Sequence, residues 1–279
     1  MEIRINGQTA DITIDHEKTV GEILASIDEW LGSSGYYLSG LCVDGNAVDT
    51  VSMNEVFLRE IEKVKLLEID TIPLAALVSM SLGYLPDDID EYEKTSFQDR
   101  SKFLDNWKQR SYVQFISGQM PELFSLYVNA FSQEGVSPET LRSITQERQR
   151  EVTDPAAEGV NLQPVLEEIC ARLTDLPLDI QIGKDMRAAQ TIQIFSGIGE
   201  KILRIVRQLD IQGYLPETAN DEKPYIQTTE EFGNVLKDLL DAYEKHDTVL
   251  VGDLAEYEIA PKLMELYEII KNSRRPAGA

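Results

Sequence analysis

The sequence contains few of the residues on which catalytic, metal-binding and disulfide-stabilised proteins depend, because its 279 residues include only two cysteines and two histidines. Cys42 and Cys170 lie in apolar runs far apart in the chain, which excludes a disulfide framework and favours buried free thiols in a reducing cytoplasm. His16 and His246 fall in neither an HxxxH nor an HxxE pattern, and no Gly-x-Ser-x-Gly motif occurs. We therefore expect no catalytic residue, no metal and no cofactor.

Positive charge is also scarce, since 26 Lys and Arg residues face 49 Asp and Glu residues, a net charge of −23. Such a surface repels phosphate backbones and anionic lipid, so we expect neither nucleic-acid nor membrane binding. The longest apolar stretch, residues 72–85, is interrupted by Ser79, Ser81 and Gly83, which excludes a membrane span. The N-terminus alternates polar and apolar residues and is unlike a signal peptide. These features predict a cytoplasmic protein.

The first 70 residues have the patterning of a small β-rich domain. Ile3 and Ile5 alternate with polar residues up to Asn6-Gly7, and the alternation resumes at Ile12 and Ile14, which predicts a hairpin. A helix follows, beginning with capping-box spacing at Thr19 and Glu22. Further strands are predicted over residues 37–43, ending at Asp44-Gly45, and over residues 64–69, with a short polar stretch and a helical turn between them.

This order of elements resembles the ubiquitin-like β-grasp fold, with the corner after the third strand at residues 44–48. The resemblance covers about a quarter of the chain and implies a protein-binding or structural module. Carrier members of that fold end in a free Gly-Gly tail, whereas here the last strand continues through residues 70–73 into more protein. The resemblance therefore argues against carrier or modifier chemistry.

Beyond residue 72 the periodicity is helical, so the fold class is predicted to be α+β: a β-grasp domain followed by an all-α helical-bundle body. A short helix should end near Pro86, a long helix should cover residues 88–117, and a helix starting at Ser137-Pro138 has so few apolar residues that it should be exposed or face a partner. A loop is expected at residues 153–159. Antiparallel helices are predicted over residues 162–175, 185–211, 229–245 and 248–272. The predicted domains are 1–71, 72–152 and 158–272, with a disordered tail at 273–279.

The helix over residues 185–211 carries an apolar seam from Ala188 to Leu209 at spacings of four and three. Such a seam belongs to a helix packed lengthwise against others. The neighbours could be helices of the same chain or of a second copy, so a homodimeric structural protein is one hypothesis. Gly199 within the seam should allow close approach of a neighbouring backbone.

The segment 247–261 is the most unusual part of the body. Pro261 is predicted to lie within a helix and to kink it, and Asp253, Glu256 and Tyr257 lie within one turn of each other. They form either a small polar ligand site or the outer face of a kinked packing helix. Together with the helix start at residues 182–185, the segment is similar to an uncharacterised helical family of bacteria with a β-grasp-like N-terminus. That resemblance supplies no function.

Four tyrosines are predicted near the junction of the two parts: Tyr36, Tyr37, Tyr84 and Tyr92. Aromatic side chains anchor many interfaces, so these residues could form a partner site. The alternative is that they pack the two parts against each other.

The sequence therefore favours a non-enzymatic interaction module in the bacterial cytoplasm that binds another protein or self-associates. It would act as an adaptor, a scaffold or a chaperone of the secretion or flagellar type. One competing hypothesis is a small-ligand-binding or enzymatic helical domain with its site near Asp253, Glu256 and Tyr257. The other is the homodimer.

Overall fold

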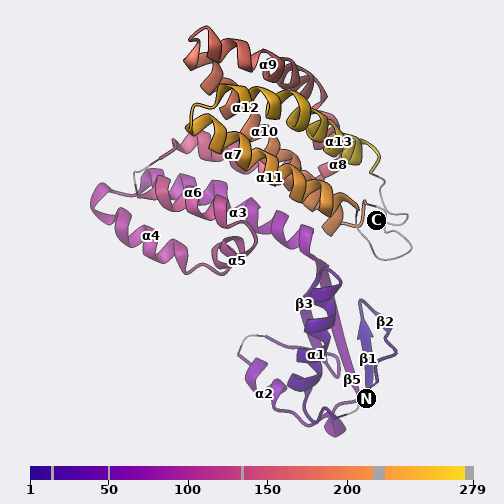
Figure 1. Ribbon diagram of the computed structural model, residues 1–279. Coiled ribbons are helices and arrows are strands. Elements are labelled where there is room, and N and C mark those ends of the chain that lie inside the picture. Colours follow the sequence, from indigo (N-terminus) through magenta and orange to yellow (C-terminus); the bar gives the residue numbers. More distant parts are fainter. Residues whose placement is uncertain (14–15, 50, 133–134, 216–223, 274–279) are drawn as a thin grey trace. The chain divides into compact units, whose positions relative to one another are not determined.

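The computed structural model describes residues 1–13, 16–49, 51–132, 135–215 and 224–273 (Figure 1). Ile14 and residues 274–279 of the predicted tail at 273–279 lie outside these residues. The chain divides into two compact units, Met1–Ser81 and Leu82–Ala279. A small N-terminal sheet is followed by a mostly helical body, which confirms the predicted α+β class.

The first unit contains a mixed five-stranded sheet in the order β2-β1-β5-β3-β4. β1 runs parallel to β5, and the other neighbouring pairs are antiparallel. The strands are β1 (Glu2–Ile5), β2 (Gln8–Thr9), β3 (Tyr36–Val43), β4 (Asn46–Ala47) and β5 (Leu66–Pro73). The helices of this unit are α1 (Val20–Ser33), α2 (Met53–Phe57) and the short 3₁₀ turn η1 (Ile61–Lys63).

Helix α1 packs against the sheet through the apolar stripe that its sequence predicts. The capping box at its start is present: the Thr19 hydroxyl accepts from the Glu22 amide at 3.3 Å, and the Glu22 carboxylate accepts from the Thr19 amide at 3.2 Å. Leu67 and Ile69 of β5 are almost completely buried beneath the helix. The core of the unit is completed by apolar residues of both elements and of β1 and β3: Ile3, Val20, Ile23, Leu24, Ile27, Leu31, Leu41 and Val43.

The predicted hairpin is correct at its turn and wrong in the length of its second strand. Asn6 and Gly7 have φ values of 49° and 77°, which suits a two-residue turn. β2 contains only Gln8 and Thr9, and Ile12 lies outside any strand. The strand is short because only Arg4 and Ile5 of β1 are paired with it.

Asp44, at the corner after β3, links two strands through its carboxylate. Its Oδ1 accepts from the amides of Leu66 at 2.9 Å and Lys65 at 2.8 Å, and its φ is 51°. These amides lower the pKa of the Asp44 carboxyl. Because the folded-state pKa lies below the unfolded value, the contribution of Asp44 to stability is present above the unfolded pKa and is lost as the pH falls through the folded one.

We therefore expect Asp44→Asn to weaken the acid dependence of the first unit. Asparagine tolerates positive φ and keeps an oxygen acceptor, but it cannot titrate. Hydrogen-exchange protection of the β5 amides, followed from about pH 6 to about pH 3, should converge for the two proteins as the pH falls. Asp28→Asn, at an exposed position of α1, is the control. Parallel pH profiles for wild type and Asp44→Asn would contradict the assignment.

The second unit consists of helices, and α3 (Leu74–Lys94) continues into it from the first. The predicted boundary at Pro86 is wrong, because the helix passes through this proline. Leu82, Leu85 and Ile89 share one buried face of α3, and their packing offsets the hydrogen bond that proline cannot donate. The next elements are η2 (Phe97–Asp99), α4 (Arg100–Lys108), α5 (Ser111–Gln119), α6 (Pro121–Phe131), α7 (Pro138–Thr153) and α8 (Pro155–Val160).

An aromatic cluster holds the first helices of this unit together. The ring of Trp107 stacks on Tyr127 at a centroid distance of 5.7 Å and meets the edge of Phe131 at 5.2 Å. Beside it, the buried Asp88 carboxylate accepts from Trp107 Nε1 at 2.8 Å. Arg110 and Tyr112 also donate to this carboxylate, so one acid joins α3, α4 and α5. Burial raises the pKa of Asp88, although its three donors act in the opposite sense.

Helix α7 begins as predicted, with the Ser137 hydroxyl accepting from the Thr140 amide at 3.2 Å, but it is not an exposed helix. Glu151 is buried and forms ion pairs with Arg148 at 3.0 Å and with Arg204 of α10 at 3.0 Å. The predicted loop at residues 153–159 is also wrong, because most of it forms α8. Apolar periodicity did not predict this packing, because the contact is made by charged side chains.

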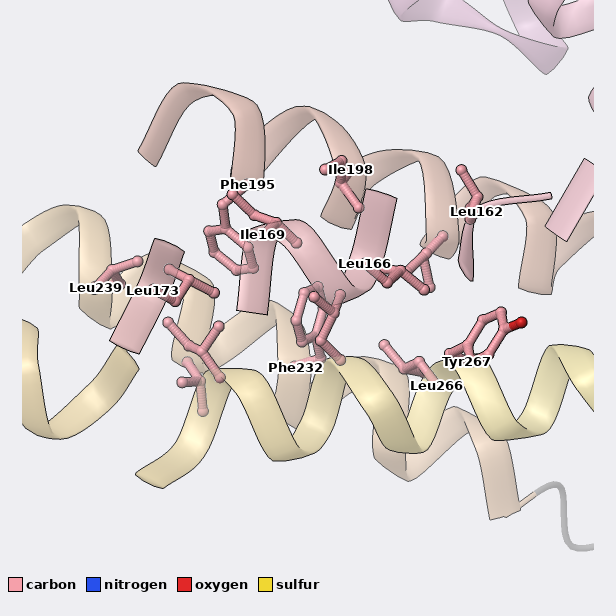
Figure 2. Close-up of a cluster of buried hydrophobic side chains, with 14 of the residues drawn as sticks. Leu162, Leu166, Ile169, Leu173, Phe195, Ile198, Phe232, Leu239, Leu266 and Tyr267 are labelled. Carbon is pink, nitrogen blue, oxygen red and sulfur yellow. The ribbon is translucent and has the colours of Figure 1, made fainter. Parts of the chain in front are cut away.

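The remaining helices pack around one core: α9 (Gln163–Gln181), α10 (Asp185–Ile211), α11 (Pro224–Glu244), α12 (Thr248–Asp253), the π-helical segment η3 (Leu254–Ile259) and α13 (Ala260–Lys271). Figure 2 shows Leu166, Phe195, Phe232 and Leu266 converging from four of them. The seam of α10 is covered by the chain's own helices, so it offers no free face to a second copy.

Two details of the bundle differ from the sequence prediction. A methyl group at Gly199 would lie 3.1 Å from the Phe232 ring, so the close neighbour of this glycine is a ring rather than a backbone. α11 begins at Pro224, five residues before the predicted start at residue 229. α11 packs along α12, η3 and α13, as predicted for an antiparallel hairpin.

Candidate functional site

The residues predicted as a polar ligand site lie on the outer side of the last helices. Asp253 ends α12, Glu256 and Tyr257 lie in η3, and Pro261 lies in α13. All four side chains are exposed, and Tyr257 is 68% exposed. Small-ligand sites usually enclose most of the ligand surface. These positions lack that enclosure, and a site formed by them stays a prediction.

Pro261 is accommodated differently from the predicted kinked α-helix. The turn before it is π-helical, and Leu254, Ala255 and Ile259 point into the core while Tyr257 faces water. A π-helix bonds each amide to a carbonyl five residues back, so it shifts the hydrogen-bond register ahead of a residue that has no amide hydrogen. The buried face of the helix is thereby kept on both sides of the proline.

The four predicted interface tyrosines do not belong to one unit. Tyr36 and Tyr37 lie in β3 of the first unit, and Tyr36 is 42% exposed. Tyr84 of the second unit is half exposed and packs its ring 4.9 Å from that of Tyr112. Tyr92 is buried in the aromatic cluster, stacked on Phe131, so it is not accessible to a partner.

A different surface stands out, at the end of the bundle where α9 meets α10 and α11 meets α12. Both turns lie at the same end of the bundle (Figure 1), and large apolar side chains are exposed on these helix ends. We call them the apolar end patch: Leu178 (57% exposed), Ile182 (55%), Met186 (78%), Val249 (71%) and Leu250 (43%). Gly252 of α12 packs on Pro177 of α9, where a methyl group would lie 3.0 Å from the ring. Exposed apolar side chains scattered singly are ordinary, but a group on adjoining elements marks an interaction surface.

The turn between α9 and α10 is held in place by a buried acid. Asp179 forms ion pairs with Arg187 at 3.1 Å and with Lys184 at 3.6 Å, and only 4% of its side chain is exposed. Gly183 has a φ of 72°, which a glycine adopts without strain. The start of α10, including Met186, is therefore positioned by local interactions.

The turn between α11 and α12 is equally well defined. His246 has a φ of 57°, a left-handed conformation that is uncommon for a non-glycine residue. Asp247 then caps α12, since its carboxylate accepts from the Leu250 amide at 3.1 Å. The cap fixes the start of α12, which carries the exposed residues Val249 and Leu250.

A small cavity of about 200 Å³ opens between these two turns, and we call it the end pocket. Ala188 and Val251 are buried in its wall, and Asp185 and His246 are exposed at its edge. Its full lining is Ile180, Asp185, Ala188, Tyr243, His246, Thr248 and Val251. An apolar cavity with a few polar groups at the rim, on a surface with exposed apolar residues, is the arrangement of a side-chain binding pocket.

The sequence analysis missed this surface, although the sequence carries a signal for it. Val249, Leu250 and Val251 are consecutive in a helix and therefore span about 200° around its axis. One core cannot cover all three, and the structure buries only Val251. Leu178 of α9 and Ile182, the residue directly after this helix, are four residues apart and are also left exposed, because the inward positions at this end of α9 are Leu176 and Asp179.

A larger and more open cavity, of about 540 Å³, is lined in part by Tyr92, Glu93 and Arg100. Gly135, which also lines it, directly follows in sequence two residues that are outside the described ones, and Glu93 is already paired with Arg142 at 2.6 Å. In the part of the chain that the structure describes, no three His, Cys, Asp or Glu side chains are grouped to hold a metal ion. The same residues include no helix with the length and apolar character of a membrane span.

Comparison with known proteins finds matches to both units. Residues 1–73 match the family model of the TP0873 N-terminal domain, and residues 160–269 match that of a domain of unknown function, DUF8042. An uncharacterized protein of Treponema pallidum (strain Nichols) is 25% identical over 266 residues, which cover 95% of this chain and 94% of that protein. No solved structure matches. The end pocket lies within the second match, and none of these names states an activity.

Proposed function

We propose that this protein is a non-enzymatic interaction module that binds another protein through the apolar end patch. The observation that carries the proposal is the exposure of five large apolar side chains on the helix ends next to the two turns that flank a preformed pocket. Interfaces gain most of their free energy from a few apolar anchors in such pockets. An adaptor, a scaffold or a chaperone of the secretion or flagellar type would use the patch in this way.

The first unit is, in this proposal, a ubiquitin-like β-grasp domain that supplies a second docking surface. Three features support the assignment: the strand order β2-β1-β5-β3-β4, the parallel pairing of β1 with β5, and the packing of α1 on the sheet. Trp30 of α1 is 55% exposed and Leu58 is 78% exposed, so this unit also presents apolar side chains to solvent.

A cytoplasmic location is part of the same proposal. Cys42 and Cys170 are free and half-buried, and burial raises the pKa of the Cys170 thiol. A higher thiol pKa lowers the thiolate fraction and with it the reactivity. Two unpaired thiols, of which the Cys170 thiol has low reactivity, suit a reducing compartment.

The proposal is tested by a photoreactive amino acid placed at Val249 of the full chain in the cell of origin. We expect a discrete cross-linked product with a second protein, because Val249 is 71% exposed within the patch. Leu178→Ser and Met186→Ser, made together in the same protein, should abolish the product, because both remove apolar contact area without touching the core.

The matched control places the photoreactive residue at Glu230, an exposed position of α11. Glu230 lies 13 residues before Tyr243, which corresponds to about 20 Å along the helix. The same product from both positions, or no product from Val249, would contradict the proposal.

A further inference from the structure

The chemistry of the end pocket indicates what kind of segment it receives. An apolar cavity of about 150 Å³ holds benzene, so the end pocket, at about 200 Å³, has room for one side chain of the size of leucine, methionine or phenylalanine. Its wall suits an apolar group, because Ile180, Ala188 and Val251 contribute aliphatic surface. The apolar end patch beside it would cover the flanking apolar surface of the same segment.

The surroundings of the pocket are acidic. The segments 175–188 and 237–256, which carry the pocket and the patch, contain nine Asp and Glu residues and four Lys and Arg residues, a balance of −5. Lys184 and Arg187 are already engaged by Asp179 of α9. Asp185, at the edge of the pocket, is exposed and forms no ion pair among the residues that the structure describes.

We propose that the end pocket receives one large apolar side chain from a basic segment of a partner protein, and that Asp185 pairs with a Lys or Arg beside that side chain. This inference rests on the proposed interaction function and adds the chemistry of the partner. Apolar anchoring supplies most of the affinity, and the acidic rim selects basic segments over acidic ones, because complementary charge contributes mainly to specificity and association rate.

The test uses the full chain labelled with ¹³C at its methionine methyl groups, of which the sequence has six. Met186 is 78% exposed in the patch, whereas Met80 is 55% exposed in the first unit and Met264 is 37% exposed on α13. The probe is a short amphipathic helical peptide of leucine and lysine. We expect it to shift the Met186 methyl resonance and to leave those of Met80 and Met264 in place.

Two altered peptides separate the apolar anchor from the charge. Replacing the leucines by alanine should weaken binding by about tenfold or more, because the anchor is lost. Replacing the lysines by glutamate should also remove the shift at Met186. Equal binding of the leucine–glutamate peptide would overturn the inference about charge. It would leave the proposed function intact, because cross-linking at Val249 does not depend on the sign of the partner's charge.

Variants of the protein test the role of Asp185. Asp185→Lys should weaken binding of the leucine–lysine peptide by about three- to tenfold. Glu230→Lys makes the same charge change about 20 Å along α11 from the pocket residue Tyr243 and should have a smaller effect. Equal effects of the two variants, or equal shifts at all exposed methionines, would show adsorption to an acidic surface and would overturn the proposal. Self-association of the chain that Met186→Asp disrupts would also overturn it, because the occupant would then be a second copy.

Discussion

Replacing Asp88 with alanine is expected to lower the free energy of unfolding of the second unit by about 3–5 kcal/mol. Asp88 is 2% exposed and accepts hydrogen bonds from Trp107, Arg110 and Tyr112. Removing the carboxylate leaves a cation and two polar hydrogens without this partner in a largely buried site. Asp88→Asn should lower the free energy of unfolding by less, because asparagine keeps an oxygen acceptor for Trp107.

The measurement is denaturant unfolding followed by tryptophan fluorescence in a Trp30→Phe background. The sequence has two tryptophans, so Trp107, which is 1% exposed, then reports on the second unit alone. Asp87→Ala is the matched control, because Asp87 is the neighbouring acid and is exposed. If Asp88→Ala lowers the free energy of unfolding by an amount within about 0.5 kcal/mol of that for the control, the hydrogen bonds of Asp88 do not stabilise the unit.

Replacing Glu151 with alanine should also lower the free energy of unfolding of the second unit by about 3–5 kcal/mol. The Glu151 carboxylate is bound by Arg204 through two hydrogen bonds of 3.0 and 3.1 Å, and by Arg148 at 3.0 Å. Arg148 and Arg204 are 14% and 23% exposed, so without the acid two neighbouring cations repel each other at low dielectric.

A second variant separates the loss of the ion pairs from the loss of packing. Glu151→Leu combined with Arg148→Leu and Arg204→Met removes all three charges, and its stability should return to within about 1–2 kcal/mol of wild type or exceed it. Glu200→Ala, at an exposed position of α10, is the control. If the triple variant is as unstable as Glu151→Ala, the cost comes from side-chain volume and not from unpaired charge.

These two clusters also explain where sequence reasoning failed. The α7 helix was predicted to be exposed or to face a partner because it has few apolar residues, yet its buried contact with α10 of the same chain is made by Glu151, Arg148 and Arg204. The boundary at Pro86 was predicted from the cost of proline in a helix, yet the buried face of α3 and the bonds of Asp88 keep the helix continuous. In both cases the deciding interaction joins residues that are well separated in the sequence, so local patterns do not reveal it.

The sequence correctly predicted the helix starts that depend on local interactions. The capping box of Thr19 and Glu22, the cap at Ser137 and the start of α10 at Asp185 are all present. Each depends on groups within a few residues of one another. The seam of α10 was also predicted residue by residue, because a stripe at spacings of three and four can only be buried along one side of a helix.

The sequence by itself determined the α+β class, most of the helices, the scarcity of cation charge and the rarity of the residues that common catalytic and metal sites require. It did so because composition, caps and periodicity act over short distances along the chain. Only the tertiary structure decided which apolar residues remain exposed. Leu178, Met186 and Val249 are exposed on helix ends beside the end pocket because two separate turns lie at the same end of the bundle (Figure 1), and this arrangement depends on how the four helices pack.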